Sequence, residues 1–305
     1  MLYGIGDVIK RLRIQRGLSQ MELAKGLVCR THLSKIERGL VMPGKSILKA
    51  LLERLGYSPT YFPEFFFNEA EAQFEPMLES IDSLLKNRQV EEAEPLIAKL
   101  EKSEEFMAQI TYKQRLLALR AGVALHNGEQ PEVVREILAN AIKISAPNFK
   151  KEDLPLYLLT KEDIRIINMM AVLYGEEGDL NNAIDLLFCL KKNFDGRYMN
   201  NEAKGRHYPM LVYNLTKYLG MSGRYEEAID LCDEGIKFCL SASTLRHLPL
   251  IILNKACCSY EIGDIKGCTA LLEEAYYSSR MYRRFDTANN IKNYVREKNL
   301  NIVFE

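Results

Sequence analysis

The sequence predicts an all-α protein in which a small basic helical domain is followed by a long stack of helical pairs. Three observations predict this fold class. Apolar residues recur at helical spacing nearly throughout, and almost no strand signal follows residue 75. Positive charge is concentrated in the first 60 residues, and one turn pattern recurs along the remainder of the chain.

The first 60 residues carry the pattern of four short helices. Apolar residues one turn apart predict a first helix over about 7–16. Ser19 and Glu22 have the spacing of a capping box, so a second helix begins at Ser19. A third helix is expected over about 30–38 and a fourth over about 45–55, each with an inward apolar face.

Charge divides the chain in the same way. Residues 1–60 contain eleven Lys and Arg but four Asp and Glu, a net charge of +7, and the neutral total leaves −7 on the remainder. A polyanion-binding module joined to a separate regulatory domain would show this distribution. A solvated charge imbalance would show it equally well, so charge alone leaves both interpretations open.

Two sequence blocks favour the first of these interpretations, a nucleic-acid-binding module. LRIQRGLSQMELA and LSKIERG follow one another at the spacing of the repressor-type helix-turn-helix family, which the chain resembles over about residues 5–56. The resemblance implies that the third helix enters the major groove of double-stranded DNA. It places Arg30, Thr31 and Lys35 at base edges with His32 and Ser34 beside them, Gln20 at a phosphate, and Arg13 with Glu37 in a buried structural ion pair.

The turn of this motif departs from the family pattern. Val28 occupies the position where the family has glycine and positive φ, a conformation that strains a β-branched residue. Gly26 lies two residues earlier. Cys29 stands where a Ser or Thr usually caps the third helix. We therefore expect a reshaped turn, and the base-contact positions could shift with it.

Residues 61–76 are predicted to form a packed hinge between a DNA-binding domain at 1–60 and a repeat domain at 77–305. Pro59 and Pro63 exclude a continuous helix through its start. The aromatic residues near 57–67 are too many for a flexible linker, and we interpret the phenylalanines among them as packing residues rather than a ligand cage.

The body repeats a polar turn followed by a small residue. The small positions are Ala93, Val133, Ala183, Ala228 and Cys268, with a second small residue twelve places earlier at Ala171, Thr216 and Ala256. Small residues allow the two helices of a pair to approach closely. The pattern resembles tetratricopeptide repeats with a longer period, and implies a curved α-solenoid whose concave face binds a segment of another chain. The segment after Tyr282 is expected to cap the stack or mediate dimerisation.

Asparagines precede the small residues on successive first helices of the pairs. Asn168, Asn214 and Asn254 are expected to face the groove as a ladder, because an amide can pair with both the N–H and the C=O of an extended peptide. Arg165 and Lys217 are candidates for a peptide carboxylate. Alternatively, one or more asparagines bond to a neighbouring helix.

The sequence favours a non-enzyme. The four histidines are far apart, no catalytic or phosphate-binding motif is present, and no metal site or cofactor is expected. Seven cysteines without a C-x-x-C pair indicate reduced, mostly buried thiols. No signal peptide and no membrane span are expected, which favours a cytoplasmic protein.

A helix-turn-helix followed by an extended tetratricopeptide-like solenoid resembles the peptide-pheromone regulators of the Rgg and PlcR type. This resemblance implies a cytoplasmic homodimer that regulates transcription in quorum sensing and whose repeat domain binds a short signalling peptide. Two alternatives have the same architecture: a regulator controlled by a protein partner, and a ligand-independent repressor. A scaffold that does not bind DNA is disfavoured by the intact LSKIERG block.

Overall fold

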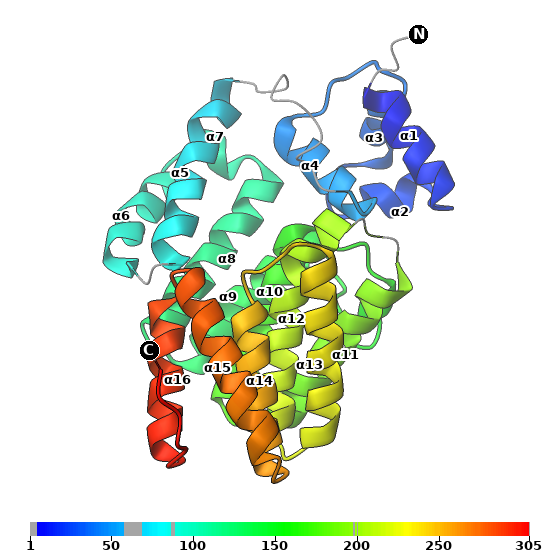
Figure 1. Ribbon diagram of the computed structural model, residues 1–305. Helices are drawn as coiled ribbons and strands as arrows, with labels where there is room; N and C mark the ends of the chain where they lie inside the picture. Colours follow the sequence, from blue (N-terminus) through cyan, green and yellow to red (C-terminus); the bar gives the residue numbers. More distant parts are fainter. Residues whose placement is uncertain (1–4, 58–68, 87–88, 198, 200, 305) are drawn as a thin grey trace. The chain divides into compact units, whose positions relative to one another are not determined.

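A computed structural model describes residues 5–57, 69–86, 89–197, 199 and 201–304 (Figure 1). Within these ranges every regular element is a helix, which confirms the all-α class. Contacts divide the chain into two compact units, which we call the first unit (1–173 with 192–203) and the second unit (174–191 with 204–305).

The first four helices match their expected positions closely. They are α1 (Ile5–Gln15), α2 (Gln20–Ala24), α3 (Arg30–Glu37) and α4 (Lys45–Arg54). Ser19 and Glu22 form the expected capping box at the start of α2. The four helices enclose a small core in which Leu33 and Ile36 of α3 are fully buried. Packing of one face of α3 therefore leaves its opposite face outside this core.

The turn between α2 and α3 avoids the strain expected at Val28. Gly26 adopts the positive φ, at +71°, and Val28 is not among the described non-glycine residues with positive φ. Glycine takes this conformation without a steric penalty, whereas a β-branched residue does not. Cys29 is the N-cap residue of α3 and its side chain makes no capping hydrogen bond, as expected from its type.

The helices after the fourth form the body of the first unit. They are α5 (Glu69–Lys86), α6 (Val90–Glu101), α7 (Glu104–Met107), α8 (Ile110–His126), α9 (Pro131–Ser145), a 3₁₀ turn (Leu154–Leu156) and α10 (Lys161–Glu176). Helix α5 begins inside the range predicted as a hinge and continues through Pro76. The aromatic part of that hinge, at 58–68, lies outside the described residues.

Aromatic side chains organise the core of this body. Phe106 stacks on Tyr112 with ring centroids 4.9 Å apart, and Phe74 meets both rings edge-on. All three are almost completely buried. Because they come from α5, α7 and α8, their packing holds these helices together.

Helices also make up the second unit. The remaining elements are α11 (Leu180–Gly196), α12 (Asn201–Met221), α13 (Tyr225–Ser241), α14 (Leu248–Glu261), α15 (Ile265–Met281) and α16 (Phe285–Glu297). We call α12, α14 and α16 the A helices of this unit, and α13 and α15 its B helices. α12 and α14 are each followed by a short turn into a B helix, and α16 is followed by residues 298–304, which form no regular element.

The repeat register is confirmed at all but one position. Ala93, Ala183, Ala228 and Cys268 are fully buried, as are the earlier small residues Ala171, Thr216 and Ala256. The prediction for Val133 is wrong: its side chain is 46% exposed, and its neighbour Val134 is buried instead. Pro131 begins α9, so the helix starts one residue away from where the repeat pattern placed it, and the inward face moves by one position.

Candidate functional sites

Helix α3 presents a polar face to solvent. Arg30, Thr31 and Lys35 are exposed, while His32 and Ser34 are partly buried. Between them, Leu33 and Ile36 anchor the helix in the core. A short helix anchored on one face, with cationic and hydroxyl side chains on the other, has the form needed for the major groove of DNA.

A buried ion pair holds α3 against α1. The guanidinium of Arg13 donates from Nε to Glu37 Oε1 at 2.6 Å and from Nη2 to Glu37 Oε2 at 2.9 Å. Burial alone would raise the pKa of Glu37, but hydrogen bonds from Arg13 and Gln20 outweigh it and lower the pKa. This bidentate pair fixes the angle at which α3 leaves the core.

Gln20 also belongs to this ion pair. Its Nε2 donates to Glu37 Oε2 at 2.8 Å, so the amide links the start of α2 to the end of α3. The sequence indicated a phosphate contact at this position and did not indicate the internal bond. Gln20 therefore has a structural partner in the protein before any nucleic acid is considered.

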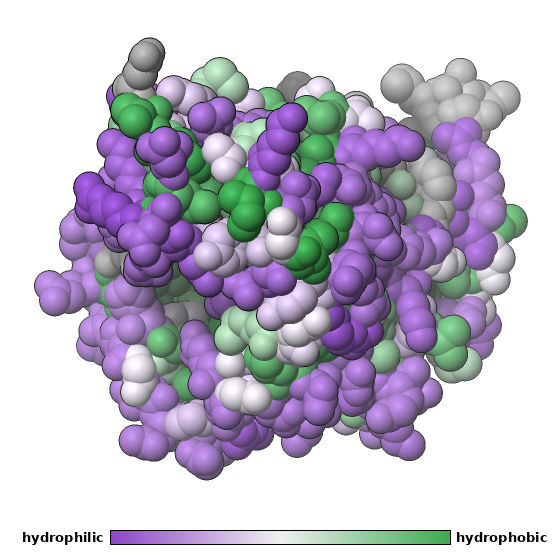
Figure 2. All heavy atoms as spheres, turned by 60° about the horizontal axis from the view of Figure 1, so that its bottom comes forward, coloured by the Kyte–Doolittle hydropathy of each residue, from purple (hydrophilic) through white to green (hydrophobic). Residues whose placement is uncertain are grey.

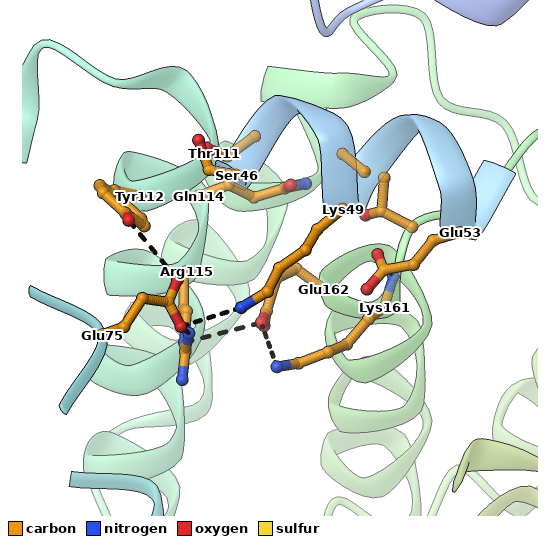
Figure 3. Close-up of a pocket in the computed structure, with 12 residues that line it drawn as sticks. Ser46, Lys49, Glu53, Glu75, Thr111, Tyr112, Gln114, Arg115, Lys161 and Glu162 are labelled. Carbon is orange, nitrogen blue, oxygen red and sulfur yellow. Dashed lines mark hydrogen bonds and ion pairs between the residues drawn. The ribbon is translucent and has the colours of Figure 1, made fainter. Parts of the chain in front are cut away.

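A polar cavity lies beside α4 within the first unit (Figure 3). It has a volume of about 60 Å³ and is lined by α4, α5, α8 and the start of α10. Lys49 of α4 reaches Glu75 of α5 at 3.0 Å, and Lys161 approaches Glu162 at 3.5 Å. These charged side chains face one another across the cavity in Figure 3.

Arg115 lies at the centre of this cluster. It is 2.9 Å from Asp82, 3.7 Å from Glu75 and 3.8 Å from Glu162. Burial alone would lower its pKa, but the surrounding carboxylates raise it. With three carboxylates facing one guanidinium and two nearby lysines, the charges of the cluster largely compensate one another.

The same region fastens α4 to the body of the first unit. The backbone N–H of Lys161 donates to Glu53 at 2.8 Å, and burial raises the pKa of the Glu53 carboxyl. Arg197 donates to the carbonyls of Glu53 and Arg54 at 3.0 and 3.1 Å. Burial lowers the pKa of both Arg54 and Arg197 to about 10. None of these partners was indicated by the sequence, because 108 and 144 residues separate the bonded positions.

The expected peptide-facing asparagines do not share one environment. Asn254 of α14 donates from Nδ2 to the carbonyl of Tyr213 and to Thr216 Oγ1, both at 2.9 Å. Its amide thus ties two A helices together, which was the alternative open at the sequence level. Asn214 is buried on α12. Asn168 is buried on α10, in the first unit, so the three are not in a single unit.

The two candidates for a peptide carboxylate also differ. Arg165 has carboxylate partners already: Nη1 is 2.9 Å from Asp82 and 4.0 Å from Glu162. Lys217 is exposed, with Nζ 5.4 Å from the ring centroid of Tyr218. Arg165 is therefore part of the charged cluster beside α4.

Six of the seven cysteines are buried or partly buried, and Cys29 is exposed. All seven cysteines are free. Burial raises the pKa of Cys232 to about 12 and that of Cys239, Cys257, Cys258 and Cys268 to about 11. Among the described residues, no group of three or more His, Cys, Asp or Glu is placed to hold a metal ion.

One face of the molecule is mainly polar. Hydrophilic side chains dominate the face drawn in Figure 2, with hydrophobic ones in scattered groups. Of the helices in the described ranges, none has the length and apolar character needed to span a membrane.

Comparison with known proteins agrees with the N-terminal architecture. Residues 9–62 match the helix-turn-helix family, which identifies the class of the N-terminal domain. A search of curated protein sequences found no match.

Solved structures resemble the chain along almost its whole length. PlcR of Bacillus thuringiensis, in complex with the peptide PapR7 and DNA, aligns with 98% of this chain and 99% of its own, at 20% identity and a TM-score of 0.60. ComR from S. thermophilus, with DNA and its signalling peptide ComS, aligns over 97% and 100% at 14% identity and a TM-score of 0.50. The pheromone receptor Rgg2 of Streptococcus dysgalactiae aligns over 96% and 99% at 13% identity and a TM-score of 0.51. At these identities the likeness is one of fold: a helix-turn-helix followed by helical repeats.

Proposed function

We propose that this protein is a DNA-binding transcription regulator whose repeat body binds a short signalling peptide. The observation that carries the proposal is the combination of an exposed, cationic face on α3 with a helical-repeat body in one chain. The fold likeness to PlcR, which was solved with both a peptide and DNA, supports this combination. The domain division at 1–60, 61–76 and 77–305 and a cytoplasmic location belong to the same proposal.

In this proposal DNA is read by α3. Arg30, Thr31 and Lys35 contact base edges, with His32 and Ser34 beside them, and Gln20 contacts a phosphate. Lysine and arginine on the exposed face supply both base readout and neutralisation of phosphates. The ion pair between Arg13 and Glu37 keeps α3 at a fixed angle. Base readout and phosphate neutralisation can therefore occur in the same position of α3 on the DNA.

The DNA test begins with duplexes selected from a random library by the full-length protein. We expect Arg30→Ala and Lys35→Ala each to weaken binding of the selected duplex by about 1–3 kcal/mol and to relax base preference. Lys143→Ala is the matched control, because Lys143 is an exposed lysine on α9 of the body. Undiminished affinity and base preference in the Arg30→Ala/Lys35→Ala double variant would contradict the assignment.

In the second part of the proposal, asparagines and nearby cations of the body hold an extended peptide. Asn168, Asn214 and Asn254 supply amides, with Arg165 and Lys217 as further contacts. An amide can meet a peptide backbone regardless of the peptide's side chains. Because Asn254 already bonds to α12, its role requires that its oxygen accept from the peptide or that its amide change partner on binding.

Retention of synthetic heptapeptide pools by the full-length protein tests this part. Asn214→Ala and Asn254→Ala should each reduce retention while leaving the circular dichroism spectrum and DNA binding unchanged. Thr216→Val is the control for Asn254→Ala, since it removes one interhelical acceptor of Asn254 but keeps its amide. If no pool is retained and a protein partner restores DNA regulation, the alternative of a partner-controlled regulator replaces the peptide proposal.

The proposal includes a homodimer, because one recognition helix reads few base pairs and two-fold pairing supplies affinity and specificity. Helices at the C-terminal end of the chain are the expected contact. Light scattering should give a mass near twice the 35.0 kDa of one chain. A monomer both with and without the selected duplex would exclude this arrangement.

A further inference from the structure

Two arginines of the second unit lie together at the starts of consecutive A helices. Arg246 lies just before α14, and Arg284 is the N-cap residue of α16. Arg284 Nη1 donates to the backbone carbonyl of Arg246 at 2.5 Å, so the Arg284 guanidinium lies against the backbone of Arg246. Arg246 is exposed and Arg284 is partly buried, so solvent reaches the site.

These two guanidinium groups differ from the arginines of the body that have a carboxylate partner. Five arginines of the body have a carboxylate within 4.0 Å: Arg115, Arg120, Arg135, Arg165 and Arg224. Within the described ranges, neither Arg246 nor Arg284 forms such an ion pair. Asp286 lies near enough to offset the charge of Arg284 in part, but not within ion-pair distance. The pair therefore keeps an excess of positive charge.

The groups around the pair add no further negative charge. Burial, together with Arg246 and Arg284, lowers the pKa of His247 to about 3, so the imidazole is neutral. Burial raises the pKa of Tyr213 while the charge of Arg284 acts against this, so the Tyr213 hydroxyl is protonated. Burial and the like charge of Arg246 lower the pKa of Arg284 itself. An anion bound near these arginines would relieve this repulsion.

We propose that Arg246 and Arg284 bind a carboxylate of the peptide taken up by the repeat body. This inference rests on the peptide-binding function proposed above. A guanidinium pairs with a carboxylate through two parallel N–H···O bonds, a geometry that the ammonium group of lysine cannot offer.

The position of this site connects it with the asparagines. Tyr213 links the two, because its carbonyl accepts from Asn254 while the charge of Arg284 acts on its hydroxyl. A peptide paired with Asn254 would therefore meet the arginine pair at one end of its path. Arg165 is less suited to this role, because Asp82 and Glu162 already neutralise it.

The carboxylate has two sources, a Glu or Asp side chain or the peptide C-terminus, and the test distinguishes them. The full-length protein is incubated with heptapeptide pools in which one position is fixed as Glu, or as the isosteric but uncharged Gln. Each pool is prepared with a free and with an amidated C-terminus. Retained peptides are quantified by mass spectrometry after ultrafiltration.

We expect retention of the charged pools to exceed that of their neutral counterparts by about ten- to a hundredfold, the effect of one charge-assisted contact. Loss of the preference on amidation assigns the C-terminus, and loss on the Glu-to-Gln change assigns a side chain. The Arg246→Gln/Arg284→Gln double variant should abolish the preference. Lys266→Gln removes the charge of an exposed lysine on α15 and should preserve it.

A charge-reversed variant gives a signature that a structural role would not produce. Arg246→Glu/Arg284→Glu should prefer pools with a fixed Lys. Retention without any preference for carboxylates, or a preference that survives the Gln double variant, would overturn the arginine site while leaving peptide binding intact. Failure to retain any pool would overturn the peptide function and this site together.

Discussion

Gly26 has a positive φ and also lies against the body of the first unit. The Gly26→Ala variant tests both features. Its φ is +71°, in the left-handed region. A Cβ atom at this position would lie 2.1 Å from the carbonyl oxygen of Ser145, and 2.7 Å from the carbon of the same group. Ser145 ends α9, so the contact lies between the turn of the DNA-binding motif and the body of the first unit.

Two terms set the expected magnitude. Placing an L-residue in the left-handed region costs about 1–2 kcal/mol. Relieving a 2.1 Å contact with backbone requires a shift of roughly 1 Å, and overpacking of this kind costs about 1–3 kcal/mol more. Gly17→Ala is the matched control: its φ is +67°, but a Cβ there meets nothing within 4 Å. The difference between the two variants therefore isolates the contact with Ser145.

Native-state hydrogen exchange is the suitable measurement, because it reports local opening free energies in a chain with more than one compact unit. Amides of α2 and α3 should open about 1–3 kcal/mol more easily in Gly26→Ala than in Gly17→Ala. Opening free energies that fall equally in the two variants, within about 0.5 kcal/mol, would refute the reasoning. That result would mean that the turn does not approach α9 in solution.

Two further predictions follow from buried positions. The pKa of Glu37 is lowered in the folded protein, so its ion pair stabilises fully above the ordinary value of 4.5 and is lost as the pH falls through the lowered value. Glu37→Gln should destabilise the N-terminal helices by about 3–5 kcal/mol at pH 7, and their opening free energy should then depend less on pH. Hydrogen exchange at several pH values measures both effects. An unchanged pH profile would contradict the prediction. Val134→Ala should lower the free energy of unfolding, measured by urea titration, by about 1–3 kcal/mol. Val133→Ala, at an exposed site, should change it by less than about 0.5 kcal/mol. The reverse order would support the register expected from the sequence.

The sequence by itself determined the elements that depend on short-range interactions. The capping box at Ser19 and Glu22 and the bounds of α3 follow from contacts within about four residues, which the order of amino acids encodes directly. The buried small residues of the repeats follow from helical periodicity in the same way. Val133 fails because Pro131 sets the start of α9, and one residue of shift rotates a helix by about 100°.

Only the tertiary structure decided which distant groups meet. Arg165 faces Asp82 across 83 residues of chain, Arg197 reaches Glu53 across 144, and Asn254 bonds to α12 across 41. The sequence shows a charged or amide side chain at each position but not its partner, because partners are set by how helices of unequal length stack. Arg246 and Arg284 illustrate the same limit: 38 residues apart, they become a pair only because α14 and α16 begin side by side.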